Sequence, residues 1–262
     1  MYGSRSTIDS YGDSMMVSPE AMRAQTFVPE TGHETEFSFD QTPTYLFRVY
    51  DPASPGITST EEVTSQAMHD RYKQAESDVT DLLSLPPGDA AKRLSHHLSW
   101  VYYHEKHCNL MSWSSSLLFV LQYGLFRHVK VKQTPLSEIQ LIMIDTREFP
   151  KQTFLRDLDA IQYFLPYSTG EAVTQPGGRW LDLEALKKKR EADMYFGEYL
   201  TQGRLDIRGK YQELNVSNIK YDPMSEKMAE LKQFREVMES VKRDRTESLL
   251  TQSLSAMEKL TV

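Results

Sequence analysis

Cysteine is almost absent from this sequence, since Cys108 is the only one among 262 residues. A single cysteine excludes an internal disulfide and is typical of proteins that fold in a reducing compartment. The sequence also lacks an apolar run long enough to span a bilayer and a basic-then-apolar signal at its beginning. We therefore expect a soluble, intracellular protein, cytoplasmic or nuclear, with no membrane among its partners.

The sequence also has fewer basic than acidic residues. It contains 30 Lys and Arg residues and 37 Asp and Glu residues, which gives a net charge of −7. Such a chain is not generally attracted to nucleic acid, which is therefore not an expected partner. No Walker loop, no Gly-x-Gly-x-x-Gly loop and no Gly-x-Ser-x-Gly elbow occurs in the sequence. These absences argue against a P-loop nucleotidase, a Rossmann domain and an α/β-hydrolase.

The chain divides into three regions by composition. Residues 1–41 are rich in Ser, Thr, Gly and acidic residues and have no hydrophobic period, which predicts a disordered acidic arm. Residues 42–221 alternate strand-like and helix-like segments, which predicts one α+β domain. Residues 222–262 are predicted to form an amphipathic helical tail that packs on the domain or pairs with another helix. The apolar face of this tail consists of Leu231, Phe234, Met238 and Val241.

Short β-branched or aromatic runs predict the strands of the domain, and apolar residues at 3–4 spacing predict its helices. The expected strands are 44–50, a short segment before Ser112, 139–145, 194–201, 204–207 and 211–216. The expected helices are 61–84, 87–104, a helix that follows the Ser112 cluster and ends near 126, 153–164 and 182–192. Because 139–145 is almost wholly apolar, we expect it to lie in the interior of the sheet.

A cluster of serines between Met111 and Leu117 joins one expected strand to the next helix. Serine hydroxyls at a helix N-terminus accept hydrogen bonds from unpaired N–H groups, and the helix dipole attracts anions to the same place. The cluster therefore fits either a simple helix cap without a ligand or part of an anion-binding site.

Three short motifs follow one another along the expected strands. Arg48 lies in the first strand, Ser112, Trp113 and Ser114 end the second, and Glu198 lies in a late strand. Simpler alternatives exist for the charged residues. Arg48 could lie on the exposed face of an edge strand, and Glu198 could face solvent in an alternating strand.

The order of these motifs resembles the Arg–Ser–Glu signature of the ADP-ribosyltransferase superfamily. More closely, the run from Leu46 to about Val216 resembles a fungal domain family of unknown function that shares the pattern. The resemblance implies an α+β fold with an ADP-ribosyltransferase-like split β-sheet and flanking helices. It also implies that the protein binds NAD as its substrate and either transfers ADP-ribose to an unknown acceptor or hydrolyses NAD.

The resemblance implies a role for each residue that would bind NAD. Arg48 would hold phosphate or ribose oxygens, because a guanidinium is a forked donor of hydrogen bonds. Ser112 would hold the nicotinamide ribose and Ser114 would supply a second hydroxyl. Trp113, or an aromatic residue such as Tyr123, would stack on a ring.

Glu198 would be the catalytic residue, because a carboxylate stabilises the positive charge that develops on the ribose as nicotinamide leaves. The sequence departs from the family at two positions. Trp113 stands where threonine is frequent, which places an indole in or beside the pocket, and Phe196 stands where arginine-modifying members carry Gln or Glu. Arginine modification is therefore not expected. The alternative function is a non-catalytic module of the same fold that binds a partner, or a second copy, through residues 225–262.

Other polar groups lie outside these motifs. Histidines and Cys108 crowd the end of the expected helix 87–104 and could bind a soft metal ion, but no second pair of ligands follows, so no metal is expected. The basic run 187–190 fits a solvent-exposed helix face, or a nuclear-targeting or anion-binding patch. Asp157 and Asp159 are two residues apart, which places them on different sides of a helix and argues against a paired-carboxylate site.

Overall fold

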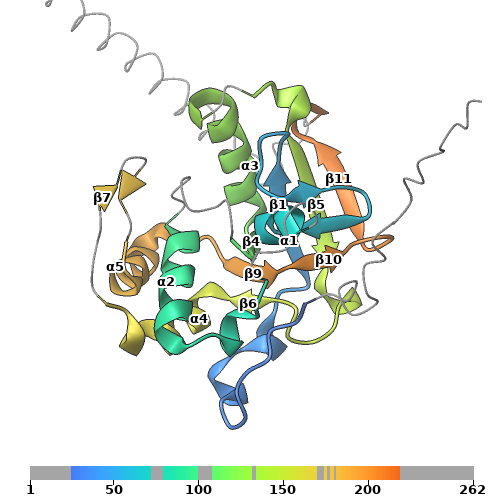
Figure 1. The fold of residues 1–262 in the computed structure, drawn as a ribbon. Helices are drawn as coiled ribbons and strands as arrows, with labels where there is room; N and C mark the ends of the chain where they lie inside the picture. The colour runs from blue at the N-terminus through green and yellow to red at the C-terminus, as the bar shows by residue number, and fades with distance from the viewer. Residues whose placement is uncertain are drawn as a thin grey trace, which may run out of the picture.

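A six-stranded antiparallel sheet organises the chain (Figure 1). Across the sheet, the strands are β11 (Tyr211–Asn215), β5 (Gln140–Asp145), β1 (Tyr45–Tyr50), β4 (Leu110–Ser114), β9 (Glu198–Gln202) and β6 (Leu155–Arg156). This computed structural model describes residues 25–71, 79–99, 108–131, 134–169, 174–175, 178–179 and 181–218.

The sheet consists of two halves that are joined at one point. In the β1 half, β5 pairs with β1 from Tyr45 to Tyr50, and β11 pairs with the outer side of β5. In the β4 half, β9 pairs with β4 from Leu110 to Ser114, and β6 pairs with the outer side of β9. Between the halves, β1 and β4 are in register only at Phe47 and Ser114. The backbone hydrogen-bond ladder is therefore nearly interrupted in the middle of the sheet.

Two smaller sheets accompany the large one. The first contains β10 (Arg204–Asp206), β3 (Glu62–Thr64) and β2 (Ile57–Thr58), and the second contains β7 (Thr174–Gln175) and β8 (Gly178–Arg179). The α-helices are α1 (Gln66–Arg71), α2 (Pro87–Leu98), α3 (Leu117–Phe126), α4 (Asp157–Phe164) and α5 (Leu183–Lys189). Two π-helical turns, Arg127–Val131 and Arg190–Met194, extend α3 and α5. The 3-10 helices are Glu34–Glu36, Phe39–Gln41, Leu82–Ser84, Leu136–Glu138, Thr146–Glu148, Leu165–Tyr167 and Val216–Asn218.

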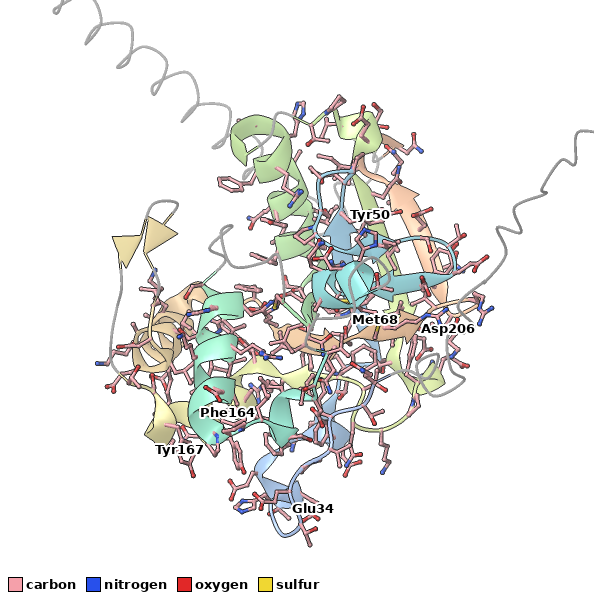
Figure 2. All side chains as sticks on the ribbon, viewed as in Figure 1. Glu34, Tyr50, Met68, Phe164, Tyr167 and Asp206 are labelled. Atoms are coloured by element: carbon pink, nitrogen blue, oxygen red, sulfur yellow. The ribbon has the colours of Figure 1, made fainter. Side chains whose placement is uncertain are left out.

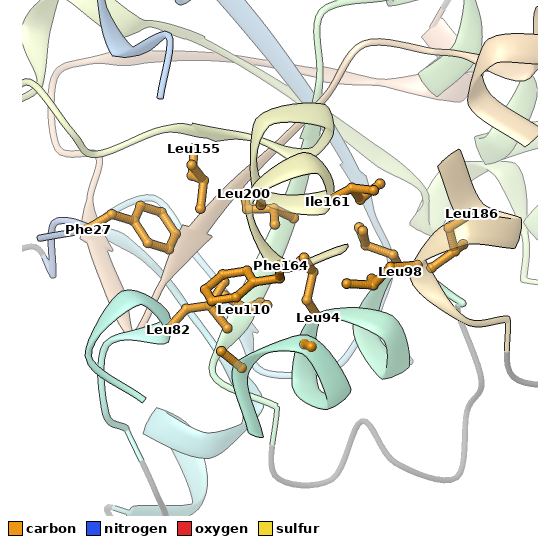
Figure 3. Close-up of a cluster of buried hydrophobic side chains, with 14 of the residues drawn as sticks. Phe27, Leu82, Leu94, Leu98, Leu110, Leu155, Ile161, Phe164, Leu186 and Leu200 are labelled. Atoms are coloured by element: carbon orange, nitrogen blue, oxygen red, sulfur yellow. The ribbon is translucent and has the colours of Figure 1, made fainter. Parts of the chain in front are cut away.

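Helices α2, α4 and α5 cover one face of the β4 half (Figure 1). Their apolar side chains meet those of β4, β6 and β9 in a buried cluster, drawn in Figure 3, which includes Phe27, Leu94, Leu110, Leu155, Ile161, Phe164 and Leu200. The opposite face of the sheet packs against the small β10-β3-β2 sheet through a second cluster with Trp113, Ile142, Tyr199 and Leu205. Helix α3 packs against the β1 half through a third cluster with Val49, Val120 and Ile139.

Figure 2 shows the side chains on these helices and strands. Phe164 lies among the side chains that surround α2 and α4, whereas Tyr50 and Met68 lie among those of β1 and α1. No helix in the described ranges is long and apolar enough to cross a membrane.

The predicted α+β fold is confirmed, and the strands 44–50, 139–145, 204–207 and 211–216 lie within a residue or two of their predicted positions. The interior position of 139–145 is also confirmed, since β5 lies between β11 and β1. The helices predicted to end near 126 and to span 182–192 correspond to α3 and to α5 with its π-turn.

Two helix predictions are partly wrong. The predicted helix 61–84 begins instead as strand β3, because the buried, β-branched Val63 and Thr64 pair with β10. Only α1 and a 3-10 turn are helical among the described residues of this range. The predicted helix 153–164 begins at Asp157, after Leu155 and Arg156 pair with β9. The predicted helix 87–104 is confirmed to Leu98, and residues 100–107 lie outside the described part.

The predicted disordered arm 1–41 is too long, because residues 25–41 pack on the domain. Phe27 is fully buried, and its N–H donates to the Gln152 carbonyl at 2.9 Å. Phe37 is buried against the ring of Tyr163, 5.0 Å away between ring centroids. Isolated aromatic residues without a period thus anchor this segment in the core. The rest of the predicted arm, 1–24, and the predicted tail, 222–262, lie outside the described residues.

Candidate functional site

A cavity of about 260 Å³ lies beside the single register pair that joins the two halves of the sheet. Strands β1 and β4 form one part of its wall, and helix α3 forms another. The end of α2 and the segment before β9 contribute His97 and Phe196. The cavity therefore lies where the backbone ladder is interrupted, which is a place where a sheet can admit a ligand between its strands.

Arg48 crosses from the β1 half to the β4 half at this cavity. Its Nη1 donates a hydrogen bond of 2.8 Å to the Ser112 carbonyl oxygen, and its guanidinium lies 6.0 Å from the centre of the Trp113 ring. Strand β1 is an interior strand and Arg48 is half-buried, so the alternative of a charge on an exposed edge strand is wrong. The structure therefore brings Arg48 and Ser112 together.

Ser112 contacts a histidine that the sequence did not assign to the site. Its hydroxyl lies 2.9 Å from Nε2 of His97, whose Nδ1 lies 3.2 Å from Sγ of Cys108. Burial, together with the positive charges of Arg48 and Arg190, lowers the pKa of His97 to about 3. The imidazole is therefore neutral at physiological pH, so one ring nitrogen donates a hydrogen bond and the other accepts one.

Trp113 points away from the two serines, because successive side chains of a strand lie on opposite faces. Its indole is 1% exposed, and its Nε1 donates to Oγ1 of Thr201 at 2.9 Å. The ring has almost no surface left for stacking on a ligand, and it supports Arg48 instead. Ser114 also has structural partners, since its hydroxyl donates to the Phe196 carbonyl at 2.5 Å and accepts from the Ser116 N–H at 3.0 Å.

The aromatic wall of the cavity comes from α3 and Phe196. The rings of Phe119 and Phe196 stack with centroids 3.9 Å apart and planes 12° apart, and Tyr123 stacks on the other side of Phe119. Both Phe119 and Tyr123 line the cavity. Trp113 also borders the cavity, but its ring is buried, so Tyr123 has the better position of the two aromatic candidates for stacking on a ligand.

Gly197 sets the turn that delivers Glu198 into β9. Its φ of 64° lies in the left-handed region, and a Cβ at this position would lie 1.9 Å from Oγ of Ser115. Its carbonyl accepts a hydrogen bond of 2.8 Å from the Ser115 N–H. Only glycine fits such a close approach with this backbone conformation.

Glu198 is fully buried and lies opposite Ser114 in the β4–β9 pair, so the alternative of a solvent-facing residue is wrong. Its Oε2 accepts a hydrogen bond of 2.8 Å from Nη2 of Arg190, and Nε of Arg190 donates to Oδ2 of Asp157. Oε1 of Glu198 is buried and has no hydrogen-bond partner in the described part of the chain. Glu198 does not line the cavity in this structure, but the Ser112 hydroxyl lies close to its carboxylate.

The environment of Glu198 favours its protonated form. Burial and the negative charge of Asp157 raise its pKa to about 7, although Arg190 and the nearby Ser112 hydroxyl act in the opposite direction. Burial also raises the pKa of Asp157 in spite of Arg190. The Arg190 guanidinium is thus shared by two buried carboxyl groups. Its single positive charge cannot balance two negative charges, so ionising both groups costs free energy.

Sequence reasoning missed His97, Asp157 and Arg190, although each lies on the buried stripe of its helix or helix extension. His97 follows Leu94 by three residues, Asp157 precedes Ile161 by four, and Arg190 follows Leu186 by four. A charged or titratable residue in register with such a stripe is the signal that could have found them. The basic run 187–190 is therefore not a wholly solvent-exposed face, since Arg190 is 7% exposed.

The described residues contain no group of three or more histidine, cysteine or acidic side chains placed to hold a metal ion. Two of the histidines that suggested such a site, His104 and His107, lie outside the described ranges.

Of three comparisons with known proteins, the one with family models finds a match. No curated protein matches the chain, and no solved structure matches it. One family model, described as a domain of unknown function (DUF7587), matches residues 41–204, which is more than half of the sequence and contains Arg48, Ser112 and Glu198. The chain therefore belongs to the family of the domain of unknown function DUF7587.

Proposed function

We propose that this protein binds NAD in the cavity between the two halves of the sheet and transfers its ADP-ribose or hydrolyses it. The observation that carries the proposal is the meeting of Arg48, Ser112 and Glu198 at one place. Arg48 donates to the Ser112 carbonyl, and the Ser112 hydroxyl lies beside the Glu198 carboxylate. These are the three residues of the Arg–Ser–Glu signature, and they come from three strands that are distant in the sequence.

The sheet supports the same proposal. A split β-sheet is what resemblance to the ADP-ribosyltransferase superfamily implies, and here β1 and β4 are in register at a single pair of residues. The cavity of about 260 Å³ is at the small end of the range for ligand sites, so it would hold one part of a dinucleotide. Arg48 would attract the pyrophosphate, and the neutral His97 would hold Ser112 for the ribose hydroxyls.

The reaction needs a negative charge beside the ribose carbon from which nicotinamide departs. Glu198 is the carboxylate nearest to the cavity residue Ser112, but it is paired with Arg190. In our proposal, NAD binding draws the ionised Glu198 carboxylate from Arg190 towards the cavity, where it stabilises the positive charge on the ribose. Phe196, which lines the cavity two residues earlier, offers no polar group to an arginine acceptor, so the acceptor is of another class.

A second function is favoured by the position of Glu198 outside the cavity lining. In this alternative the protein keeps the same fold, does not turn NAD over and acts as a non-catalytic interaction module. The predicted helical tail, 222–262, would then provide the contact with a partner.

The test is to measure NAD binding by calorimetry and nicotinamide release by chromatography with the full-length protein. We expect Glu198→Gln to retain NAD binding and to lose nicotinamide release by about 100-fold or more. Arg48→Gln should weaken binding by about 10-fold or more, because it removes a charged donor. Arg147→Gln is the matched control, since Arg147 lies on the surface and pairs with Asp145.

Each outcome has a distinct meaning. Unchanged nicotinamide release by Glu198→Gln would contradict the catalytic assignment. Binding without release in the wild-type protein would favour the non-catalytic module. A folded wild-type protein that does not bind NAD would contradict the NAD site and would favour the interaction module.

A further inference from the structure

Three ends of helices meet at the buried edge of the site, and each brings a titratable side chain. Asp157 begins α4, Arg190 follows α5, and His97 lies in the last turn of α2. Asp157 and Glu198 are fully buried and Arg190 is 7% exposed, so water does not screen the charges between them. The polar and charged groups that face Glu198 from the surrounding elements are Arg190, Asp157, Ser112 and the neutral His97, with Arg156 more distant.

The charges of this cluster do not balance. With both carboxyl groups ionised, one guanidinium faces two negative charges and the cluster carries a net charge of −1. An uncompensated charge in a protein interior costs several kcal/mol, and a carboxyl group avoids this cost by taking up a proton. Arg156, whose charge also acts on Asp157, has other partners, since its guanidinium donates to the Tyr195 hydroxyl at 3.2 Å and lies 4.0 Å from Asp159.

Hydrogen bonding determines which carboxyl group takes the proton. Oδ1 of Asp157 accepts from the Leu158 N–H at 2.7 Å, and its Oδ2 accepts from Arg190. Both oxygens of Asp157 are therefore satisfied as acceptors. Glu198 has one oxygen on Arg190, whereas Oε1 has no hydrogen-bond partner of good geometry among the described residues, although the Ser112 hydroxyl lies close to the carboxylate. A proton on Oε1 removes the excess charge and leaves the hydrogen bonds of Arg190 to both carboxyl groups in place.

We propose that Arg190 positions the Glu198 carboxyl group and that burial beside Asp157 keeps this group protonated, against the attraction of Arg190, until its proton is released to solvent, so that the site is switched on by a rise in pH. The role in turnover rests on the proposed NAD reaction, in which only the ionised carboxylate acts. The proton equilibrium itself rests on the buried cluster alone. Because the pKa of Glu198 is about 7, the switch operates near neutral pH.

The test is a pH titration of the Glu198 carboxyl carbon by ¹³C NMR on the full-length protein, with the signal identified by its loss in Glu198→Gln. We expect the wild-type midpoint to lie near 7. Asp157→Asn removes the second negative charge and should lower the midpoint by about one pH unit or more. Asp159→Asn is the matched control. It lies two residues along the same helix, accepts from the Ser38 N–H and should leave the midpoint unchanged.

A Glu198 carboxyl that is already fully ionised at pH 5 in the wild-type protein would overturn the inference without any variant. An unchanged midpoint in a folded Asp157→Asn protein would also overturn it. The same samples separate the inference from the proposed function. If the wild-type protein releases no nicotinamide but Glu198 titrates as expected, the NAD reaction alone is contradicted. If the wild-type protein turns NAD over but Glu198 does not titrate as expected, the switch alone is contradicted.

Discussion

Two guanidinium–carboxylate sites are buried among the residues that the structure describes, and they differ in their charge balance. At the first, Arg127 makes a forked pair with Asp51 through Nε and Nη2. The Thr134 hydroxyl and the Ala53 N–H also donate to the Asp51 carboxylate, at 3.0 and 2.9 Å. At the second, Arg190 divides its donors between Asp157 and Glu198, and one Glu198 oxygen has no partner in the described part of the chain.

The difference appears in the pKa values. Burial alone raises the pKa of Asp51, but the hydrogen bonds and charge of Arg127 outweigh it, so the pKa is lowered overall. Burial and Asp157 raise the pKa of Glu198 to about 7, and Arg190 does not compensate. A balanced pair in a core holds parts of the fold together, whereas an unbalanced cluster can exchange a proton at physiological pH. The second site contains a residue of the Arg–Ser–Glu signature, Glu198, whereas the first contains none.

The largest expected effect comes from breaking the balanced pair. Asp51→Asn leaves the buried Arg127 cation without a counter-charge and should lower the free energy of unfolding by about 3–5 kcal/mol at pH 7. Urea unfolding followed by circular dichroism measures this loss. Asp145→Asn, at the surface pair with Arg147, is the control and should cause no measurable change. Equal losses in the two variants would show that burial of the Arg127–Asp51 pair does not matter.

A smaller effect, with a dependence on pH, should follow from neutralising the unbalanced cluster. The folded-state pKa of Glu198 lies above its ordinary value of 4.5, so its contribution to stability is present below pH 4.5 and is lost as pH rises through 7. Glu198→Gln has no such loss, because its side chain stays neutral. Relative to the wild-type protein, this variant should therefore gain about 1–3 kcal/mol between pH 5 and pH 8.

Urea unfolding at several pH values measures that gain. A difference between Glu198→Gln and wild type that stays constant over this range would mean that Glu198 is ionised throughout, like Asp51. The contrast between the two sites would then be lost.

The smallest effect should come from removing one hydrogen bond of the balanced pair. Thr134→Val deletes the hydroxyl that donates to Oδ2 of Asp51 and should cost about 1 kcal/mol. Because Asp51 keeps Arg127 and its lowered pKa, the loss should be the same at pH 6 and pH 8. Thermal unfolding at pH 6 and at pH 8 measures this loss of stability. A loss that grows as the pH rises would indicate that Asp51 also exchanges a proton in this range.

The sequence predicted the parts of the fold that depend on local pattern. Alternating or continuous apolar runs predicted β1, β5, β10 and β11, and the serine before Leu117 does cap α3, since the Ser116 hydroxyl accepts from the Phe119 N–H. The segments that were assigned wrongly depend on distant partners. Thr64 pairs with Arg204, and Phe27 enters a core that is built by three helices.

The candidate site shows the same limit. The resemblance of the motif order to the Arg–Ser–Glu signature implied that Arg48, Ser112 and Glu198 would lie close together, and the antiparallel strands β1, β4 and β9 bring them to one part of the sheet. The sequence did not predict that Glu198 would be buried against Arg190. Arg190 also contacts Asp157, which is 33 residues away in the sequence and reaches the same place from another helix. The orientation of Trp113 away from the serines follows from strand alternation and could have been predicted.

A crystal structure of the Glu198→Gln protein grown with saturating NAD would test the proposed NAD site directly. We expect dinucleotide density in the cavity beside β1 and β4, with the pyrophosphate within hydrogen-bonding distance of Arg48 and a ribose at Ser112. NAD bound elsewhere on the surface, or an empty cavity at a concentration that saturates binding in solution, would contradict the central claim that this cavity is an NAD site.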